Sequence, residues 1–304
     1  MDFGPRTPDV RIIEAMESGI TGLDPIYCGD ITTPRAYAFR PRDGRLTGVG
    51  AVLRPGSEQI TMPVLAFAVH HPTAGTVLID TGLHADAIRD LRADFDTFLA
   101  FLFRTLRPAG EPFDEQLGEL GIAPAAVELV VMTHLHVDHT SGMRLLPSAE
   151  FVCAREEWAA ATGARPNRGG YAPAHLPDAG RMRLVDFARD GESHGPFSRT
   201  IDLLGDGSIR LVSTAGHTRG HLSVLLRRQD GSEVLLVGDA AYTLESIREQ
   251  RLPLVTVDDE AHARSLRELK AYRDENPGAR VVPSHDEHAW RTLVQDSPAV
   301  ARTP

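Results

Sequence analysis

Four side chains able to bind metal occur within six consecutive residues, and this cluster restricts the chain more than any other feature of its sequence. They are His134, His136, Asp138 and His139. Imidazole nitrogen and carboxylate oxygen are ligands that a borderline-soft divalent ion such as zinc favours. A lone histidine is more often a structural or solvent-exposed residue, but four such groups at this density indicate a metal site.

The cluster follows a short apolar run, ELVVMTH at 128–134, which predicts a buried strand. If that strand continued, His134, His136 and Asp138 would share one of its faces. If the chain bends after His136 instead, the first two histidines can bind one ion while the Asp-His pair faces a second. The first geometry crowds the ligands into one metal site, and the second forms two metal sites.

Three further metal-competent residues stand where other apolar runs end. His217 follows LVSTAG, Asp239 follows VLLVG and His285 follows VVPS. Each of them alone is weak evidence, although loops at strand ends carry many functional residues. Together they supply enough ligands to complete two metal shells and a carboxylate able to bridge the ions.

The distribution of apolar residues predicts a single domain over 1–304 that mixes strands with helices. Besides the run at 128–134, we expect a buried hairpin and further strands in these ranges: 62–82, 151–154, 209–217, 223–239 and 279–286. The other expected elements are strands and loops over 1–60, a long surface loop at 163–180, an amphipathic helix at 259–275 and a frayed tail at 297–304.

The segment 84–120 changes character and is expected to be a helical insertion of one or two amphipathic helices. Its apolar stripe at helical spacing is formed by Phe95, Phe98, Leu99, Leu102 and Leu106. Phe101 and Phe103 fall off that stripe. We favour ordinary packing for them, and the alternative is an apolar surface for a substrate pocket or a partner subunit.

Charge and composition limit the classes of molecule that the chain is expected to bind. Acidic residues number 42 against 32 basic ones, for a net charge of -10, which disfavours nucleic acid and anionic membranes and suits a small neutral substrate. No apolar run is long enough to span a bilayer, and the first residues have no signal-peptide pattern, so we expect a cytoplasmic location. Cys28 and Cys153 stand outside any CxxC pair and are expected to be structural.

Four separated motifs now combine into one pattern: THLHVDHTSG at 133–142, AGHTRGH at 215–221, VGDAAYT at 237–243 and PSHD at 283–286. In this order and spacing, and with the Asp-Thr-Gly at 80–82, the chain resembles the metallo-β-lactamase superfamily over most of its length. The resemblance implies an αβ/βα sandwich, an α/β fold of two mixed β-sheets flanked by helices. It also implies two divalent metal ions, for which zinc is expected.

The resemblance further implies two ligand sets and one bridging carboxylate: His134, His136 and His217 (the first ligand set), Asp138, His139 and His285 (the second ligand set), and Asp239 between the two ions. Asp80 is expected near the metal site rather than only in a turn. His221 is expected to make a structural hydrogen bond rather than to bind metal. Seven other histidines carry no motif and are expected to be structural or exposed.

Within the superfamily the chain resembles the N-acyl homoserine lactonases, which place a tyrosine three residues after the bridging aspartate, as Tyr242 follows Asp239 here. By that likeness Tyr242 hydrogen-bonds the lactone carbonyl and stabilises the developing oxyanion. A water shared by two divalent ions loses its proton near neutral pH, so a hydroxide that bridges the metals is the implied nucleophile. Asp138 is implied to carry the proton to the leaving ring oxygen. A homodimer, common among similar lactonases, is the expected assembly.

Two alternatives stay open. Other superfamily members hydrolyse thioesters, phosphodiesters or β-lactams, and the metal residues do not separate these activities. The chain lacks an obvious basic C-terminal helical domain for a glutathione thioester, and it has an Asp-His pair where many zinc β-lactamases use a cysteine. A metal-binding module without catalysis is disfavoured, because every expected ligand position holds a competent residue.

Overall fold

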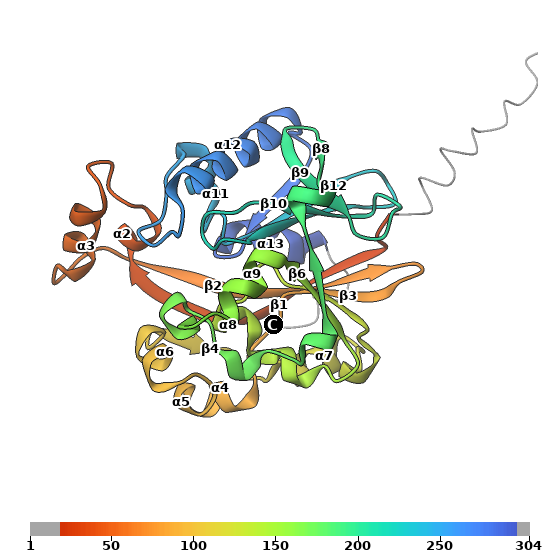
Figure 1. Ribbon diagram of the computed structural model, residues 1–304, viewed down its shortest axis with the longest axis horizontal. Helices are drawn as coiled ribbons and strands as arrows, with labels where there is room; N and C mark the ends of the chain where they lie inside the picture. Colours follow the sequence, from red (N-terminus) through yellow and green to blue (C-terminus); the bar gives the residue numbers. More distant parts are fainter. Residues whose placement is uncertain (1–18, 297–304) are drawn as a thin grey trace, which may run out of the picture.

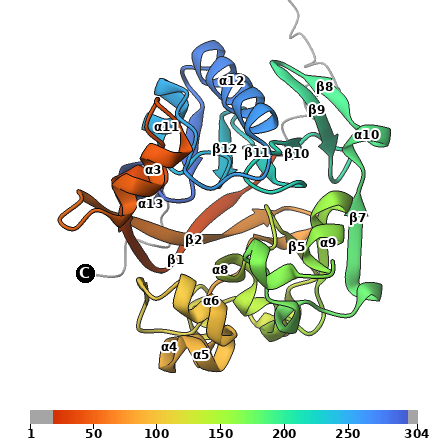
Figure 2. The same cartoon turned by 60° about the vertical axis from the view of Figure 1, so that its left-hand side comes forward.

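Two β-sheets packed face to face, with helices on their outer sides, organise the protein (Figure 1). The computed structural model describes residues 19–296, so the tail expected at 297–304 lies outside the described residues. Helices α11 and α12 cover the outer side of one sheet, and α4 to α9 lie on the outer side of the other (Figure 2). This layering confirms the expected αβ/βα sandwich.

The first sheet has seven strands. In spatial order they are β4 (Leu106–Pro108), β1 (Gly22–Pro34), β2 (Gln59–His71), β3 (Gly75–Ile79), β5 (Leu129–Val131), β6 (Glu150–Ala154) and β7 (Met182–Val185). β2 and β3 pair as the antiparallel hairpin that the sequence predicts at 62–82. From β3 to β7 the pairing is parallel, so the sheet is mixed.

The second sheet has six strands. In spatial order they are β13 (Arg280–Pro283), β12 (Glu233–Gly238), β11 (Leu222–Arg227), β10 (Ile209–Ser213), β9 (Phe197–Asp202) and β8 (Glu192–His194). β12 and β13 are parallel and the other pairs are antiparallel. The predicted strands at 209–217, 223–239 and 279–286 all appear here, in shorter form.

Alternation along the strands builds the core in layers. On β3, Val77 and Ile79 point between the two sheets while Leu78 points toward the helices. Successive side chains of a strand face opposite sides of a sheet, and apolar residues on both faces are typical of a strand buried on both sides. The middle of the first sheet is therefore buried on both faces, against the second sheet on one side and against helices on the other.

The remaining helical segments connect the strands. They are α2 (Arg35–Ala38), α3 (Arg45–Leu53), η1 (Pro124–Ala126), α8 (Val137–Thr140), η2 (Ser141–Leu145), α9 (Arg155–Ala161), η3 (Pro166–Gly169), η4 (Pro173–His175), η5 (Ala179–Arg181), α10 (Phe187–Asp190), α11 (Leu244–Glu249), α12 (Asp259–Glu275) and α13 (Glu287–Asp296). α12 has the predicted bounds, and the expected loop at 163–180 contains only short 3-10 turns. In residues 19–296 no helix combines the length and apolar character that a bilayer span requires.

The expectation of strands and loops alone over 1–60 was wrong, because α3 lies there. Gly48 and Gly50 lower its intrinsic helix propensity, which hid the helix from the sequence pattern. Tertiary contacts hold it instead: Arg45 pairs with Asp259, and a Cβ at Gly48 would come within 2.6 Å of the Leu254 side chain.

The expectation of one or two helices in 84–120 was also wrong. Four short helices form: α4 (Ala85–Arg89), α5 (Leu91–Asp94), α6 (Thr97–Leu102) and α7 (Phe113–Glu119). The chain restarts at Asp90 and at Asp96, whose carboxylates accept hydrogen bonds from the first N–H groups of α5 and α6. Each restart rotates the apolar stripe, so Phe98 is 52% exposed and Leu102 51% exposed, against the prediction.

Candidate metal centre

The histidine cluster lies at the edge where β5 ends. The chain stays extended through His136 (φ -66°, ψ 155°) and then turns into α8, where the N–H of His139 donates a hydrogen bond to the carbonyl oxygen of His136. The bend after His136 is the second of the two geometries considered from sequence. It does not move the two pairs far apart, because the ring centroids of His134 and His139 lie 4.2 Å apart and those of His134 and His136 4.6 Å. One atom from each of His134, His139 and Asp239 also lies within 4.8 Å of the others.

The first ligand set converges. One ring nitrogen from each of its three histidines lies within 4.8 Å of the others. Nε2 of His217 is 3.1 Å from Nδ1 of His136. Two nitrogens that bind one tetrahedral zinc ion at about 2.0–2.1 Å lie about 3.3–3.4 Å apart. The spacing of these two imidazoles therefore suits binding of one ion.

Asp239 lies between the two ligand sets. Its Oδ2 is 3.5 Å from Nε2 of His217 and 3.3 Å from Nε2 of His285, and its Oδ1 is 3.6 Å from Nε2 of His139. Asp138 joins the cluster through Oδ2, 3.8 Å from Nε2 of His139. All seven expected ligands thus meet at one place, and their roles as ligands stay a prediction.

Four buried atoms of the expected ligands lack a hydrogen-bond partner in the described chain. They are Nε2 of His134, Nε2 of His139, Nδ1 of His217 and Oδ1 of Asp239. An unpaired buried polar atom costs about 1–3 kcal/mol and is rare in folded proteins. Nitrogen and carboxylate oxygen are zinc donors, so divalent ions would satisfy these atoms. The residues present fit a metal centre.

Burial sets the charge state of two histidines of the first ligand set. It lowers the pKa of His134 and of His217 well below 6.5, so both rings are neutral and keep a free electron pair, as metal ligands require. Burial alone would raise the pKa of Asp239, but the charge of His285 and its other histidine neighbours lower it well below 3.8. The neutral imidazoles of His134 and His217 therefore lie beside an ionised carboxylate.

Asp80 fixes the ring of His139. It lies at the end of β3 with a positive φ of 59°, a backbone region that Asp tolerates better than most residues. Its carboxylate accepts hydrogen bonds from the N–H and the hydroxyl of Thr133, and its Oδ2 is 2.8 Å from Nδ1 of His139. Burial alone would lower the pKa of His139, but the charges of Asp80 and Asp138 raise it to about 10. As predicted, Asp80 belongs to the site.

His221 makes the structural hydrogen bond that the sequence predicts. Its Nε2 accepts from the backbone N–H of Asp239 at 2.9 Å, which leaves Nδ1–H to donate to the Thr214 hydroxyl. Burial lowers the pKa of His221 to about 3, so the ring stays neutral. Gly238 has φ +62°, and a Cβ there would lie 2.7 Å from Nε2 of His221. Only glycine allows this approach, which fixes the loop that carries Asp239.

Tyr242 lies against both ligand sets. Its buried ring meets those of His217 and His285 edge-on, with centroids 5.8 and 5.2 Å away. It also stacks on Tyr37 of α2, with centroids 6.1 Å apart. Burial raises the pKa of Tyr242 well above 10, and Tyr37 and the charge of Asp239 raise it further. Sequence reasoning missed Tyr37, because the segment 1–60 carries no motif.

A second group of residues that sequence reasoning did not connect with the site joins α5 to the loop at 133–142. Asp94 has a fully buried carboxylate that accepts a hydrogen bond from Ser141 and pairs with Arg144. His175 lies on its other side, with Nε2 3.4 Å from Oδ2 of Asp94. Ser141 belongs to the motif at 133–142, so the helices after β3 are fastened directly to the loop that carries the cluster. His175 has the structural role expected of it.

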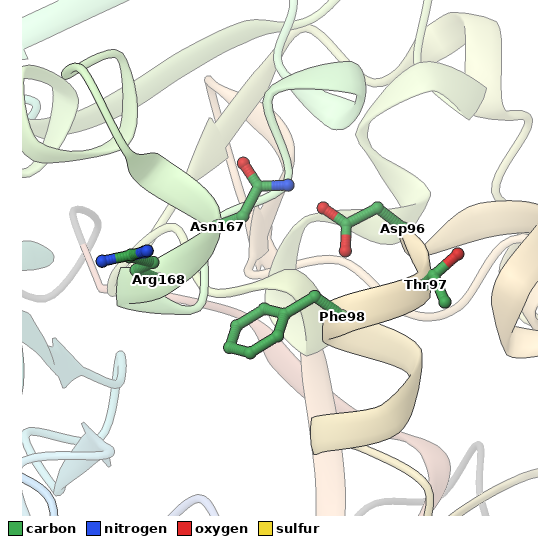
Figure 3. Close-up of a pocket in the computed structure, with 5 residues that line it drawn as sticks. All are labelled: Asp96, Thr97, Phe98, Asn167 and Arg168. Carbon is green, nitrogen blue, oxygen red and sulfur yellow. The ribbon is translucent and has the colours of Figure 1, made fainter.

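A hollow of about 470 Å³ lies between the start of α6 and η3, lined by Asp96, Thr97, Phe98, Asn167 and Arg168 (Figure 3). Gly170 follows η3 directly, and a Cβ there would come within 2.9 Å of Cδ2 of His136. The loop that forms one wall of the hollow therefore contacts the first ligand set. Cys28 and Cys153 are buried free thiols, as the sequence predicts.

The family model of the metallo-β-lactamase superfamily matches residues 61–285. The N-acyl homoserine lactonase AttM of Azorhizobium caulinodans is 33% identical over 233 residues, which cover 75% of this chain and 84% of that protein. AttM of Agrobacterium fabrum is 31% identical over 233 residues, with the same coverage of 75% and 84%.

Two solved structures share the fold. An N-acyl homoserine lactone hydrolase, with the product N-hexanoyl-L-homoserine bound at its catalytic metal centre, has a TM-score of 0.70 at 19% identity and covers 90% of this chain and 96% of that one. AidC, a dizinc quorum-quenching lactonase in complex with a product, has a TM-score of 0.58 at 16% identity, with coverage of 89% and 91%. At these identities the likeness bears on the fold alone.

Proposed function

The chain belongs to the metallo-β-lactamase superfamily, and on that premise we propose that this metal-dependent hydrolase is a lactonase that opens the ring of N-acyl homoserine lactones. Curated relatives that bear this name support the substrate class. The observation that carries the proposal is the position of Tyr242, whose ring contacts His217 of the first ligand set and His285 of the second.

The cofactor that we propose is a pair of zinc ions. The ligand assignment is the one implied by the motifs: His134, His136 and His217 for the first ion, Asp138, His139 and His285 for the second, and Asp239 shared. Unpaired buried atoms in the cluster and the neutral imidazoles of His134 and His217 support this assignment. Bound divalent ions supply a nucleophile by lowering the pKa of a water molecule, and they polarise the substrate carbonyl.

Tyr242 is the proposed oxyanion donor. As the water oxygen attacks the lactone carbonyl carbon, negative charge develops on the carbonyl oxygen, and the phenol donates a hydrogen bond to it. The raised pKa of Tyr242 keeps the phenol protonated and able to donate. Stacking on Tyr37 holds the plane of the ring, so the donor is positioned before the substrate arrives.

Asp138 is the proposed proton carrier. The attacking water gives up two protons, because the product is a carboxylate. One is released to solvent, and the other must move to the ring oxygen when the bond between the carbonyl carbon and that oxygen breaks. The carboxylate of Asp138 is buried and lies 3.8 Å from Nε2 of His139, inside the cluster where the reaction takes place. The product is the open-chain N-acyl homoserine, which carries a hydroxyl and a carboxylate.

The acyl chain of the substrate is proposed to lie in the hollow between α6 and η3. The exposed ring of Phe98 supplies an apolar wall, and the opposite wall is the loop whose Gly170 touches His136. An apolar lining with a few polar groups suits a ligand of this kind. A cytoplasmic location and a homodimer stay predictions from the sequence.

The test is a substrate panel assayed with the zinc-loaded protein. It comprises short-chain and long-chain acyl homoserine lactones, a simple lactone, an S-acyl glutathione, a bis-aryl phosphodiester and a β-lactam. We expect the highest kcat/KM with an acyl homoserine lactone. Absence of lactone turnover would refute the proposal, and two bound metals without hydrolysis of any compound would favour the binding module.

A further inference from the structure

Glu157 is a buried carboxylate outside the metal cluster that contacts the loops carrying it. It lies on α9 and is 0% exposed. Its Oε1 accepts a hydrogen bond from the N–H of Leu135 at 3.0 Å, and its Oε2 accepts one from the N–H of Gly220 at 3.1 Å. A buried carboxylate is costly unless its oxygens are hydrogen-bonded, so these two contacts hold the side chain in one position.

Both backbone donors belong to loops of the first ligand set. Leu135 lies between His134 and His136, and Gly220 follows His217 by three residues. The two oxygens of one carboxylate therefore connect the loop at the end of β5 to the loop that follows β10. These loops come from different sheets. Glu157 is one link between them, beside the hydrogen bond from the N–H of Leu222 to the carbonyl oxygen of Thr133.

A third contact reaches the ring of His136. Tyr171 forms an isolated antiparallel bridge with His136, and their rings lie 5.2 Å apart. Burial, together with the charge and the hydrogen bond of Glu157, raises the pKa of the Tyr171 phenol. The carboxylate thus approaches His136 from two sides, through the backbone of Leu135 and through the ring of Tyr171.

Gly220 packs directly against Glu157, without space for either residue to shift toward the other. A Cβ at this position would lie 2.4 Å from the backbone nitrogen of Glu157 and 2.7 Å from its Cβ. The first turn of α9 therefore presses directly on the loop of His217. A change in the length or the hydrogen bonding of the Glu157 side chain is transmitted to that loop.

We propose that Glu157 is a positioning residue that sets the separation of His136 and His217 and, through it, the affinity for the first ion. The inference rests on the proposed metal centre. Glu157 supplies no ligand atom, whereas Asp80 holds His139 in the second ligand set. The two buried carboxylates would then serve different ions. Outer contacts that orient metal ligands typically change metal affinity by about 10–100-fold.

The experiment compares Glu157→Gln with Glu156→Gln in the full chain. Glu156 is an exposed neighbour on the same helix and serves as the matched control. The glutamine replaces one acceptor oxygen with an amide donor, which then faces a backbone N–H. Zinc affinity is measured by competition with a chromophoric chelator, and folding by circular dichroism and thermal unfolding. We expect one of two zinc equivalents to bind about 10–100-fold more weakly in Glu157→Gln, and wild-type binding in Glu156→Gln.

The double variant Asp80→Asn/Glu157→Gln identifies the ion. If the two carboxylates serve different ions, both equivalents bind weakly in it, and a remaining tight equivalent overturns the assignment to the first ion. Wild-type affinity for both equivalents in Glu157→Gln, whatever its melting temperature, overturns the inference. A wild-type protein that fails to bind two ions refutes the proposed metal centre instead.

Glu157→Asp covers the case in which Glu157→Gln does not fold. It keeps the negative charge and shortens the side chain by one methylene group, so one carboxylate no longer reaches the N–H groups of Leu135 and Gly220 together. Weaker binding of one zinc equivalent in Glu157→Asp supports the inference. Unchanged binding of both equivalents overturns it.

Discussion

Nδ1 of His285 donates a 2.6 Å hydrogen bond to the carbonyl oxygen of Pro63. Pro63 belongs to β2 of the first sheet, and His285 follows β13 of the second. The bond fixes the tautomer of His285 and turns its Nε2 toward Asp239. The last expected ligand is thus oriented by the opposite sheet, and the cluster joins both halves of the sandwich.

Because the ligands come from both sheets, removal of the metal should destabilise the whole fold. A ligand at about 100 times its Kd stabilises a protein by about 2.7 kcal/mol. For a chain of 304 residues, with an unfolding entropy of about 2.1 cal/mol/K per residue, that corresponds to a fall in Tm of about 4 °C after chelation, measured by scanning calorimetry and reversed by added zinc. Asp239→Ala should lose metal and activity together and show no further shift with chelator. An unchanged wild-type Tm would contradict a metal that joins the sheets.

Tyr242→Phe should bind both zinc equivalents as the wild-type protein does and have a lower kcat. Removal of one oxyanion-hole donor costs about 10²–10³ in kcat, and the change appears in kcat rather than in KM. Tyr37→Phe is the comparison, because it leaves the Tyr242 phenol in place and should cost less. Steady-state kinetics with a hexanoyl homoserine lactone measure both variants. Intact turnover in Tyr242→Phe would show that the oxyanion role is wrong.

Asp80→Asn should weaken zinc binding by the second ligand set. Asn tolerates the positive φ of this position as Asp does, so the backbone conformation is retained. The amide has one acceptor oxygen. If that oxygen takes the place of Oδ2, which accepts from the Thr133 hydroxyl and from His139, the amide NH2 faces the Thr133 N–H that Oδ1 accepts from in the carboxylate. We expect a loss of about 10–100-fold in affinity for one equivalent, measured by chelator competition. Full affinity for both equivalents would show that Asp80 only shapes the turn.

Phe98→Ala should reduce activity on long acyl chains and spare short ones. Its ring lines the hollow between α6 and η3, whereas Phe101 on the same helix does not and serves as the control. Loss of about 1–2 kcal/mol of apolar contact corresponds to about 5–30-fold in kcat/KM for a decanoyl substrate. Equal losses for decanoyl and butanoyl lactones would exclude this hollow as the acyl site.

Asp94 should contribute to stability in a pH-dependent way. Burial alone would raise its pKa, but His175, Ser141 and Arg144 lower it below 3.8. A carboxyl whose folded-state pKa is depressed stabilises the protein above its unfolded pKa, near about 3.9, and this contribution is lost as pH falls through the folded value. Asp94→Asn should therefore lose about 1.5–3 kcal/mol at pH 7. Urea unfolding of the wild-type protein and of Asp94→Asn measures the difference in their free energies of unfolding. This difference should be smaller at acid pH, and a difference that does not change with pH would exclude the ionised carboxylate as its cause.

The sequence predicted much of the fold because its signals are local. The apolar runs at 62–82 and 128–134 are strands, and the helix at 259–275 has its predicted bounds. The segment 84–120 was less predictable, because Asp90 and Asp96 restart the helix through hydrogen bonds that the apolar spacing does not record. The helix α3 was hidden by its glycines and depends on contacts with distant residues.

By itself the sequence determined which groups can bind metal and at which strand ends they stand, since residue type and apolar runs are properties of neighbouring positions. Tertiary structure alone decided that the chain bends after His136, that Tyr37 stacks on Tyr242, and that Glu157 reaches two loops at once. Such contacts join residues far apart in the chain, and their existence depends on how the two sheets pack.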